Sequence, residues 1–237
     1  MFSQYQKGQE VFKLYGVPKD ALNKAKTQIE QKSLGKICLD YSVDNQDALC
    51  KITNNSSDLV LFDEIIKSFI NTFSKFIYAN EDISLANNAV QLLKLSGQTL
   101  CSAESFTGGA FANAIVSVPG ASEVFYEGIV CYNTDSKIKR LNVQPLTVKT
   151  HTVVSREVAF EMVRGLIEGG NCDVAVATTG YASPTGDESK PCGLCFIAVA
   201  NKQSAQVTRH LFSGDREEVI RQGKEYALFA LCKLLRG

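Results

Sequence analysis

Histidine is scarce in this sequence: only His151 and His210 occur among 237 residues. Neither stands in a glycine-rich or acidic neighbourhood, which argues against a Ser-His-Asp arrangement. The sequence also lacks the G-x-x-x-x-G-K-[ST], G-x-G-x-x-G, G-x-S-x-G and H-E-x-x-H motifs. If a serine acts as a nucleophile here, another group must take its proton, and a lysine or a tyrosine is the usual substitute for histidine.

Net charge is missing as well, because 25 basic side chains balance 25 acidic ones. This balance argues against nucleic acid or an anionic membrane as a partner. The N-terminal residues lack the basic-then-apolar order of a signal peptide. The most apolar early segment, residues 58–78, carries Asp63, Glu64, Lys67 and Lys75, so it does not predict a membrane span. We expect a cytoplasmic protein.

Eight cysteines are scattered along the chain, mostly beside Val, Leu or Ile in strand-like runs. Cys192 and Cys195 form a single C-x-x-C that leads into an apolar run rather than opening a helix. A zinc site needs about four ligands, and no second pair is present. The pattern favours reduced structural thiols, and we expect no metal and no cofactor.

The first 80 residues predict a small α+β domain. Residues 19–32 carry a helical apolar stripe, residues 36–42 and 47–54 form a candidate hairpin, and apolar residues recur at helical spacing over 59–77. The expected order is α-β-β-α, and the polar segment 78–84 is the candidate boundary.

From residue 82 to residue 237 strand and helix patterns alternate. Helices are expected at 84–95, from about 107, at 155–168 and at 215–235, and strands at 99–103, 127–132, 172–180, 193–200 and 205–212. Alternation of this kind predicts an α/β domain with a mixed, mostly parallel sheet covered by helices on both faces.

The stretch "AESFTGG" at 103–109 concentrates small polar groups where a strand meets a helix. Ligands of α/β sheets gather at such carboxyl ends of strands. Thr107, Gly108 and Gly109 would open the helix and offer backbone N–H groups to an anion. In the simpler interpretation, Ser105 or Thr107 is only the helix N-cap.

Three further clusters could contribute chemistry. Tyr132 and Asn133 end a strand, with Lys137 in a short helix behind them, and Thr179 ends another strand before a long polar loop. Arg216 lies in the first turn of the last helix, where the helix dipole disfavours a cation unless it meets an anion. Each residue also has a simpler interpretation. Tyr132 could lie at the rim of a sheet and Lys137 could be solvated. Thr179 could only end a strand, and Arg216 could simply be exposed.

Taken together, the clusters resemble one family. The segments "AESFTGG", "SVPGAS", "FYEGIVCYNTDSK", "VSREVA", "ATTGYASPTGDESKPCG" and "FSGDREEVIRQGKEYAL" occur in the order typical of the nicotinamide-mononucleotide deamidase family, the C-terminal domain of CinA-type (competence/damage-inducible) proteins. The similarity covers about residues 82–237. It implies conversion of nicotinamide mononucleotide (NMN) to nicotinate mononucleotide with release of ammonia, by a homodimer or larger homo-oligomer.

The resemblance also implies roles for individual residues. Ser105 matches the nucleophile of the A-E-S-x-T-G-G motif, and Tyr132 and Lys137 match the residues that assist it. Thr179 and Arg216 match further active-site positions, and with Thr107–Gly109 and Asn133 they would bind substrate.

The sequence departs from the family pattern in its glycines. Phe106 replaces the usual cysteine, the loop that commonly reads T-G-I-A-G-P-x-G-G has become "TGYASPTGD" at 179–187, and "HGAVS" has become "HTVVS" at 151–155. Phe106 either crowds the site or packs inward. The altered loops leave an alternative function open: a catalytically weakened homologue that binds a nucleotide or a protein.

Residues 1–80 resemble the small KH-like middle domain of longer CinA proteins. They contain no G-x-x-G loop and carry 10 Lys against 9 Asp plus Glu, so a domain-orienting or dimerising role is expected rather than RNA binding. The longer proteins also carry a molybdopterin-binding-like domain linked to ADP-ribose pyrophosphatase activity. That activity is not expected here.

Overall fold

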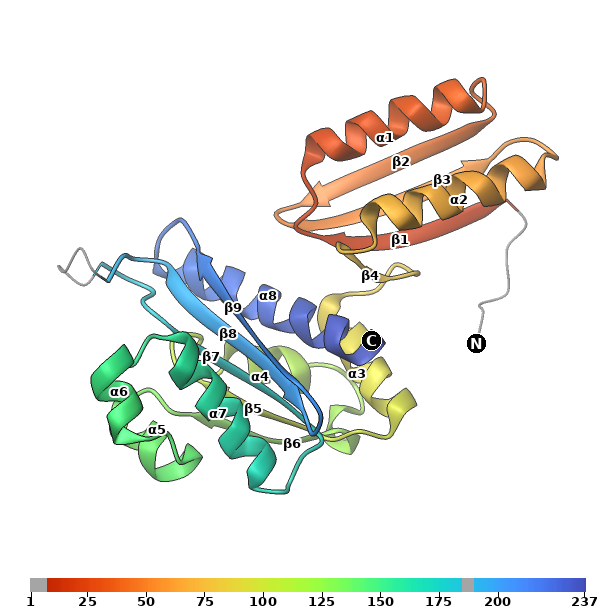
Figure 1. The fold of residues 1–237 in the computed structure, drawn as a ribbon. Coiled ribbons are helices and arrows are strands. Elements are labelled where there is room, and N and C mark those ends of the chain that lie inside the picture. The colour runs from red at the N-terminus through yellow and green to blue at the C-terminus, as the bar shows by residue number, and fades with distance from the viewer. Residues whose placement is uncertain (1–7, 185–189) are drawn as a thin grey trace. The chain divides into compact units, whose positions relative to one another are not determined.

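The computed structural model of the protein describes residues 8–184 and 190–237. The chain divides into two compact units between Ser84 and Leu85 (Figure 1). The first unit contains β1 (Gln9–Tyr15), α1 (Lys19–Lys32), β2 (Ile37–Asp44), β3 (Asp47–Asn54), α2 (Leu59–Phe73) and β4 (Ile77–Ala79).

The first unit is an antiparallel sheet in the order β2-β3-β1-β4, with α1 and α2 on one face (Figure 1). The hairpin and the first helix were predicted correctly, but the order α-β-β-α was incomplete. One strand precedes α1, and α2 ends at Phe73, so that Ile77 lies in β4 instead of a long helix. The resulting β-α-β-β-α-β order is that of ferredoxin-like folds, and the structure does not show a KH-like domain.

Apolar side chains between the helices and the sheet hold the first unit together. Phe12 of β1 lies against Phe69 of α2 with ring centroids 5.2 Å apart, and Phe73 continues the aromatic row at 4.7 Å from Phe69. Asp58 caps α2 by accepting a hydrogen bond from Leu61 N at 2.9 Å.

The second unit contains α3 (Leu85–Ser96), β5 (Leu100–Glu104), α4 (Ala110–Val116), a short 3₁₀ turn (Ala121–Glu123), β6 (Phe125–Val130), α5 (Thr134–Leu141), α6 (Pro145–His151), α7 (Arg156–Glu168), β7 (Val174–Gly180), β8 (Leu194–Asn201), β9 (Ala205–Leu211) and α8 (Arg216–Arg236). Its strands form one sheet in the order β6-β5-β7-β8-β9. The β6-β5 and β5-β7 pairs are parallel, whereas β7-β8 and β8-β9 are antiparallel. The predicted mixed α/β architecture is confirmed.

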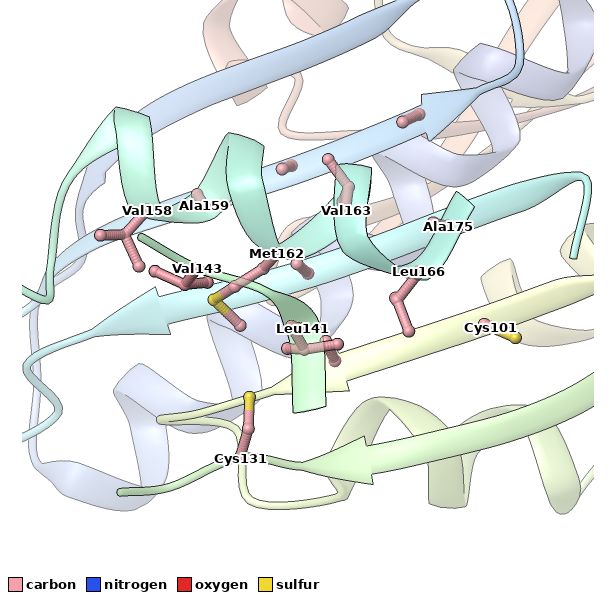
Figure 2. Close-up of a cluster of buried hydrophobic side chains, with 14 of the residues drawn as sticks. Cys101, Cys131, Leu141, Val143, Val158, Ala159, Met162, Val163, Leu166 and Ala175 are labelled. Atoms are coloured by element: carbon pink, nitrogen blue, oxygen red, sulfur yellow. The ribbon is translucent and has the colours of Figure 1, made fainter. Parts of the chain in front are cut away.

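Two layers of helices cover this sheet (Figure 1). On one face α7 packs against small strand residues such as Ala175 and Ala177, and Met162 and Leu166 point from the helix toward the strands (Figure 2). On the other face α4 and α8 pack behind the sheet. Because successive strand residues face opposite layers, Glu104 and Ala103 of β5 lie on different faces. The carboxyl ends of β5 and β7 therefore present side chains to both layers.

Helix starts explain part of the local structure. Ser155 caps α7 by accepting a hydrogen bond from Val158 N at 3.3 Å. Asp215 caps α8 by accepting from Glu218 N at 2.9 Å. The Glu218 carboxylate pairs with Arg221 and does not return a hydrogen bond to the N-cap, so the two residues do not form a capping box.

The cysteines behave as structural thiols. All eight are free, and six of them are buried. In the part of the chain that the structure describes, no group of three or more His, Cys, Asp or Glu side chains is placed to hold a metal ion. Within the same residues, no helix has the length and apolar character needed to cross a membrane.

Candidate active site

The carboxyl ends of β5 and β7 meet at a small cavity of about 130 Å³. It is lined by Ser105, Phe106, Tyr132, Thr134, Lys137, Val153, Val154, Thr179, Gly180, Tyr181, Ala182 and Arg216. Five residues singled out from the sequence, Ser105, Tyr132, Lys137, Thr179 and Arg216, thus surround one space although they are spread over more than 100 positions.

Ser105 and Lys137 form the centre of this cavity. Lys137 Nζ lies 2.9 Å from Ser105 Oγ, and Lys137 is only 1% exposed. The amine also donates to the carbonyl oxygens of Cys131 at 2.6 Å and Tyr132 at 3.4 Å. Burial lowers the pKa of Lys137 from its ordinary value because it disfavours the charged ammonium. The lysine can therefore lose its proton more readily than an exposed one.

Local sequence fixes both members of the pair. Asn133 accepts a hydrogen bond from Asp135 N and so starts α5, which places Lys137 one turn later with its side chain turned inward. Ser105 follows β5 directly, and its N–H donates to the carbonyl of Thr178 on the neighbouring strand at 3.0 Å. In the structure Asn133 therefore serves as a helix cap.

The turn after Ser105 differs from the prediction. Helix α4 begins at Ala110, not near Thr107, and neither Ser105 nor Thr107 caps it. Gly108 N donates to the Ser105 carbonyl at 3.1 Å, and Gly109 N donates to the Glu104 carboxylate at 3.0 Å. Both N–H groups already donate hydrogen bonds to Ser105 and Glu104, so Gly108 and Gly109 do not offer the anion-binding N–H groups that the sequence predicted.

The glycines of this turn are needed for their backbone conformation. Gly108 has φ +60° and Gly109 has φ +99°, values that side-chain-bearing residues rarely adopt. A Cβ at Gly108 would meet no atom within 4 Å, so lack of space is not the reason. Thr107 is buried, and its hydroxyl shares a hydrogen bond with Thr178 at 2.7 Å.

Tyr132 lies at the mouth of the cavity and is 62% exposed. Its hydroxyl accepts a hydrogen bond from Arg216 at 3.1 Å, and Arg216 also donates to Ser183 Oγ at 3.1 Å. Among the described residues, Tyr132 Oη makes no hydrogen bond to Ser105 or Lys137. Thr179 is buried, and its hydroxyl donates to the Val153 carbonyl at 2.9 Å, which holds the wall of the cavity.

Phe106 packs inward. Its ring is 3% exposed and belongs to an apolar cluster with Ala182, Cys195 and Val219. The ring fits because α8 carries Gly223 there: a Cβ at that position would lie 2.4 Å from Phe106 Cζ. Of the two loop positions where a family glycine is replaced, Ser183 accepts a hydrogen bond from Arg216 at 3.1 Å, and Asp187 lies outside the described residues.

Neither histidine lines this cavity. His210 stacks on Phe212 with ring centroids 5.0 Å apart, and burial lowers its pKa to about 4. His151 lies at a larger hollow of about 530 Å³ between α6, α7 and β9. Charged groups at that hollow are satisfied locally, for example Glu161, which accepts from Gln144 N and Thr147 Oγ1. Among the described residues that line the larger hollow there is no buried amine in contact with a serine, whereas the smaller cavity has Lys137 against Ser105.

One residue of the turn was missed as a candidate. Glu104 stands directly before Ser105 and is 1% exposed, yet it was not predicted to contribute to the site. An acidic residue at a strand end ordinarily reaches solvent, so the sequence offers only its place in the motif as a signal.

The fold and the paired side chains define a class: an α/β protein in which a buried lysine, rather than a histidine, contacts a serine at the carboxyl edge of the sheet. The sequence model of the CinA C-terminal domain matches residues 82–235. The chain belongs to the CinA family.

Relatives and solved structures agree with this assignment. A CinA-like protein of Fusobacterium nucleatum is 34% identical over 204 residues, which are 85% of this chain and 50% of that protein. A putative competence-damage inducible protein of Caldicellulosiruptor saccharolyticus is 39% identical over 162 residues, 68% of this chain and 39% of that protein. This chain thus spans half the length or less of these two relatives.

A crystal structure of a CinA superfamily protein from Klebsiella pneumoniae has a TM-score of 0.62 and 31% identity, covering 64% of this chain and 96% of the other. One from Escherichia coli has a TM-score of 0.61 and 32% identity, covering 63% and 88%. These structures support the mixed α/β architecture of the second unit.

Proposed function

We propose that this chain is an amidohydrolase that converts NMN to nicotinate mononucleotide and ammonia, with Ser105 as nucleophile. The observation that carries the proposal is the 2.9 Å contact between Ser105 Oγ and the buried Lys137 Nζ. A serine needs a base within hydrogen-bond reach, and this lysine is the titratable side chain that meets that need. Its family membership supports the reaction class, and the sequence motifs support the substrate.

The first step is acylation. Neutral Lys137 takes the proton of Ser105, and Oγ attacks the carboxamide carbon of the substrate. Phe106 lines the cavity and its N–H makes no hydrogen bond to a described residue, so we assign this N–H to the developing oxyanion. Lys137 then returns the proton to the leaving nitrogen, and ammonia departs.

The second step restores the serine. Lys137 takes a proton from water, the resulting hydroxide attacks the acyl-serine, and Oγ leaves with the proton held on Lys137. The products are the carboxylic acid and the free enzyme. We assign the proton transfers to Lys137 alone, because the hydroxyl of Tyr132 contacts Arg216 instead of Ser105.

Substrate placement follows from the size and charge of the cavity. A volume of about 130 Å³ is well below the roughly 300–1,000 Å³ of sites that enclose drug-sized ligands, so it suits only the carboxamide end of a nucleotide. The phosphate must then lie at the mouth. There the exposed guanidinium of Arg216, held by Tyr132 and Ser183, is the cation that would meet it.

Ammonia release from NMN by the purified chain tests the proposal, with Ser105→Ala as the paired variant. We expect release by the wild type and a loss on the order of 10⁶-fold in the variant, comparable to removal of other serine nucleophiles. No release by the wild type from NMN or from any other carboxamide of a test panel would overturn the amidohydrolase assignment and favour the alternative of a nucleotide- or protein-binding homologue. Release from other carboxamides but not from NMN would overturn the substrate alone.

A further inference from the structure

Glu104 is a buried acid that the mechanism above does not use. It is the last residue of β5, stands directly before Ser105, and is 1% exposed. No lysine, arginine or histidine of residues 8–184 and 190–237 forms an ion pair with it. A buried carboxylate without a cation is costly unless hydrogen bonds compensate for the lost water.

Three backbone N–H groups supply that compensation. Glu104 Oε2 accepts from Gly109 N and Phe111 N, both at 3.0 Å, and Oε1 accepts from Ala112 N at 2.8 Å. An ionised carboxylate is an acceptor only, so it can satisfy all three donors at once. Hydrogen bonds of this charge-assisted kind are among the stronger ones in proteins. The side chain thereby closes the chain from 104 to 112 into a fixed turn.

The nucleophile sits inside this closed turn. On one side of Ser105 is the Glu104 backbone in β5, and on the other is Gly109, which the Glu104 carboxylate holds. The Glu104 carbonyl also accepts from Cys131 N at 2.8 Å, and the Cys131 carbonyl accepts from Lys137 Nζ at 2.6 Å. Both partners of the Ser105–Lys137 contact are therefore anchored to the same residue.

We propose that Glu104 is a positioning residue: its carboxylate fixes the turn that holds Ser105 Oγ against Lys137 and presents the N–H group of Phe106 to the substrate. The inference rests on the proposed function, since it assigns a role in that same site. Glu104 touches neither the serine hydroxyl nor the lysine amine, so it acts through the backbone. A role limited to helix capping would affect stability without changing the reactivity of Ser105.

Two variants and a matched control separate these roles. Glu104→Gln keeps the shape but removes the charge, and it replaces one acceptor oxygen with an NH₂ donor that faces an N–H group. Glu104→Ala removes the side chain and leaves space for a small carboxylate. Asp58→Ala removes the carboxylate that caps α2 in the first unit, far from the cavity residues in sequence. Thermal unfolding and circular dichroism establish that each protein is folded.

The readouts are the rate at which a fluorophosphonate labels Ser105, located by peptide mass spectrometry, and kcat and KM for NMN. In Glu104→Gln we expect labelling and kcat to fall by about 10²-fold, the effect of misplacing a reacting group by about 1 Å. KM should change little, because Arg216 is untouched. Formate should accelerate labelling of Glu104→Ala saturably and leave the wild type unchanged. Asp58→Ala should lose stability only.

Several results would overturn the inference. These are a folded Glu104→Gln that is labelled at the wild-type rate, a raised KM with unchanged kcat, or a Glu104→Ala that formate does not rescue. Labelling also separates this inference from the proposed substrate. A wild type that is labelled at Ser105 but releases no ammonia from NMN overturns the substrate and still reports on Glu104. A wild-type Ser105 that resists the probe overturns both.

Discussion

The two units of the chain bury different kinds of side chain. In the described part of the first unit the buried polar side chains are Ser33 and Asn54, and the core is built from aromatic and aliphatic residues. The second unit buries Glu104 and Lys137 together with several hydroxyl groups at the carboxyl ends of β5 and β7. Burying a carboxylate and an amine opposes folding, so their concentration in one place marks where the molecule retains groups for chemistry rather than for stability.

This contrast predicts that catalysis depends on the second unit and stability on both. Four substitutions test this prediction, and the one expected to reduce activity most comes first.

Lys137→Arg should lower kcat/KM by about 10²–10⁴-fold, because a guanidinium stays protonated and cannot act as a base. In the wild type kcat/KM should rise with pH, since the neutral amine is the active form. The rise should end below the ordinary lysine value near about 10.4, because burial lowers the pKa of Lys137. A pH–rate profile of the wild type measures the direction of this change and the pH at which it ends.

Lys139→Arg is the matched control for that change. Lys139 lies on the same helix but is exposed and paired with Asp135. It should retain wild-type activity. A rate that is flat or falls with rising pH would show that Lys137 is not the base.

Arg216→Ala should raise KM for NMN by about 10–100-fold with little change in kcat, because a hydrogen bond to a charged group contributes about 1.5–3 kcal/mol. Nicotinamide riboside, which lacks the phosphate, should be insensitive to the change. Steady-state kinetics with both compounds provides the test. Arg164→Ala, an exposed arginine paired with Glu168 at the other hollow, is the control. Equal effects on both compounds would argue against phosphate recognition by Arg216.

Gly223→Ala should destabilise the second unit by about 1–3 kcal/mol and reduce activity several-fold, because the added Cβ would overlap the ring of Phe106 beside Ser105. In a Phe106→Cys background the same change should cost much less. Denaturant unfolding of the four proteins yields the coupling free energy. Additive effects would mean that the ring does not form the contact between α8 and the nucleophile turn.

Phe69→Ala should lower the free energy of unfolding by about 3–5 kcal/mol, since it empties a space in the aromatic core of the first unit. At a temperature where the variant is folded, kcat should not change. Differential scanning calorimetry measures the loss of stability, and ammonia release measures kcat. A large drop in kcat for folded protein would break the contrast between the units.

The elements of the fold were largely predictable because their apolar periodicity is strong. The helix at 19–32 and the buried strand ending at Thr179 and Gly180 stand where the patterns placed them. One misassigned region is the end of α2, where Phe76 and Ile77 continue the helical spacing although the helix ends at Phe73 and Ile77 is the first residue of β4. Sequence periodicity cannot distinguish these outcomes, since either one buries the same side chains.

The candidate site was predictable in its residues and only partly in their arrangement. The motifs selected Ser105, Lys137, Thr179 and Arg216, and the structure gathers all four around one cavity. The sequence did not predict that Tyr132 contacts Arg216, or that the N–H groups of Gly108 and Gly109 donate to Ser105 and Glu104. These hydrogen bonds depend on which atoms the folded turns bring within about 3 Å of each other.

Local residue patterns account for the two-part organisation, the alternation of strands and helices, the lack of a usable histidine and the residue types of the site. Long-range packing sets three further features: Lys137 Nζ lies against Ser105 Oγ, Phe106 turns inward against Gly223, and Glu104 fills the turn expected to hold an anion. The reason is physical: burial and hydrogen bonding act between atoms distant in sequence. The same serine, threonine and glycines of "AESFTGG" would accommodate either a bound anion or an internal carboxylate.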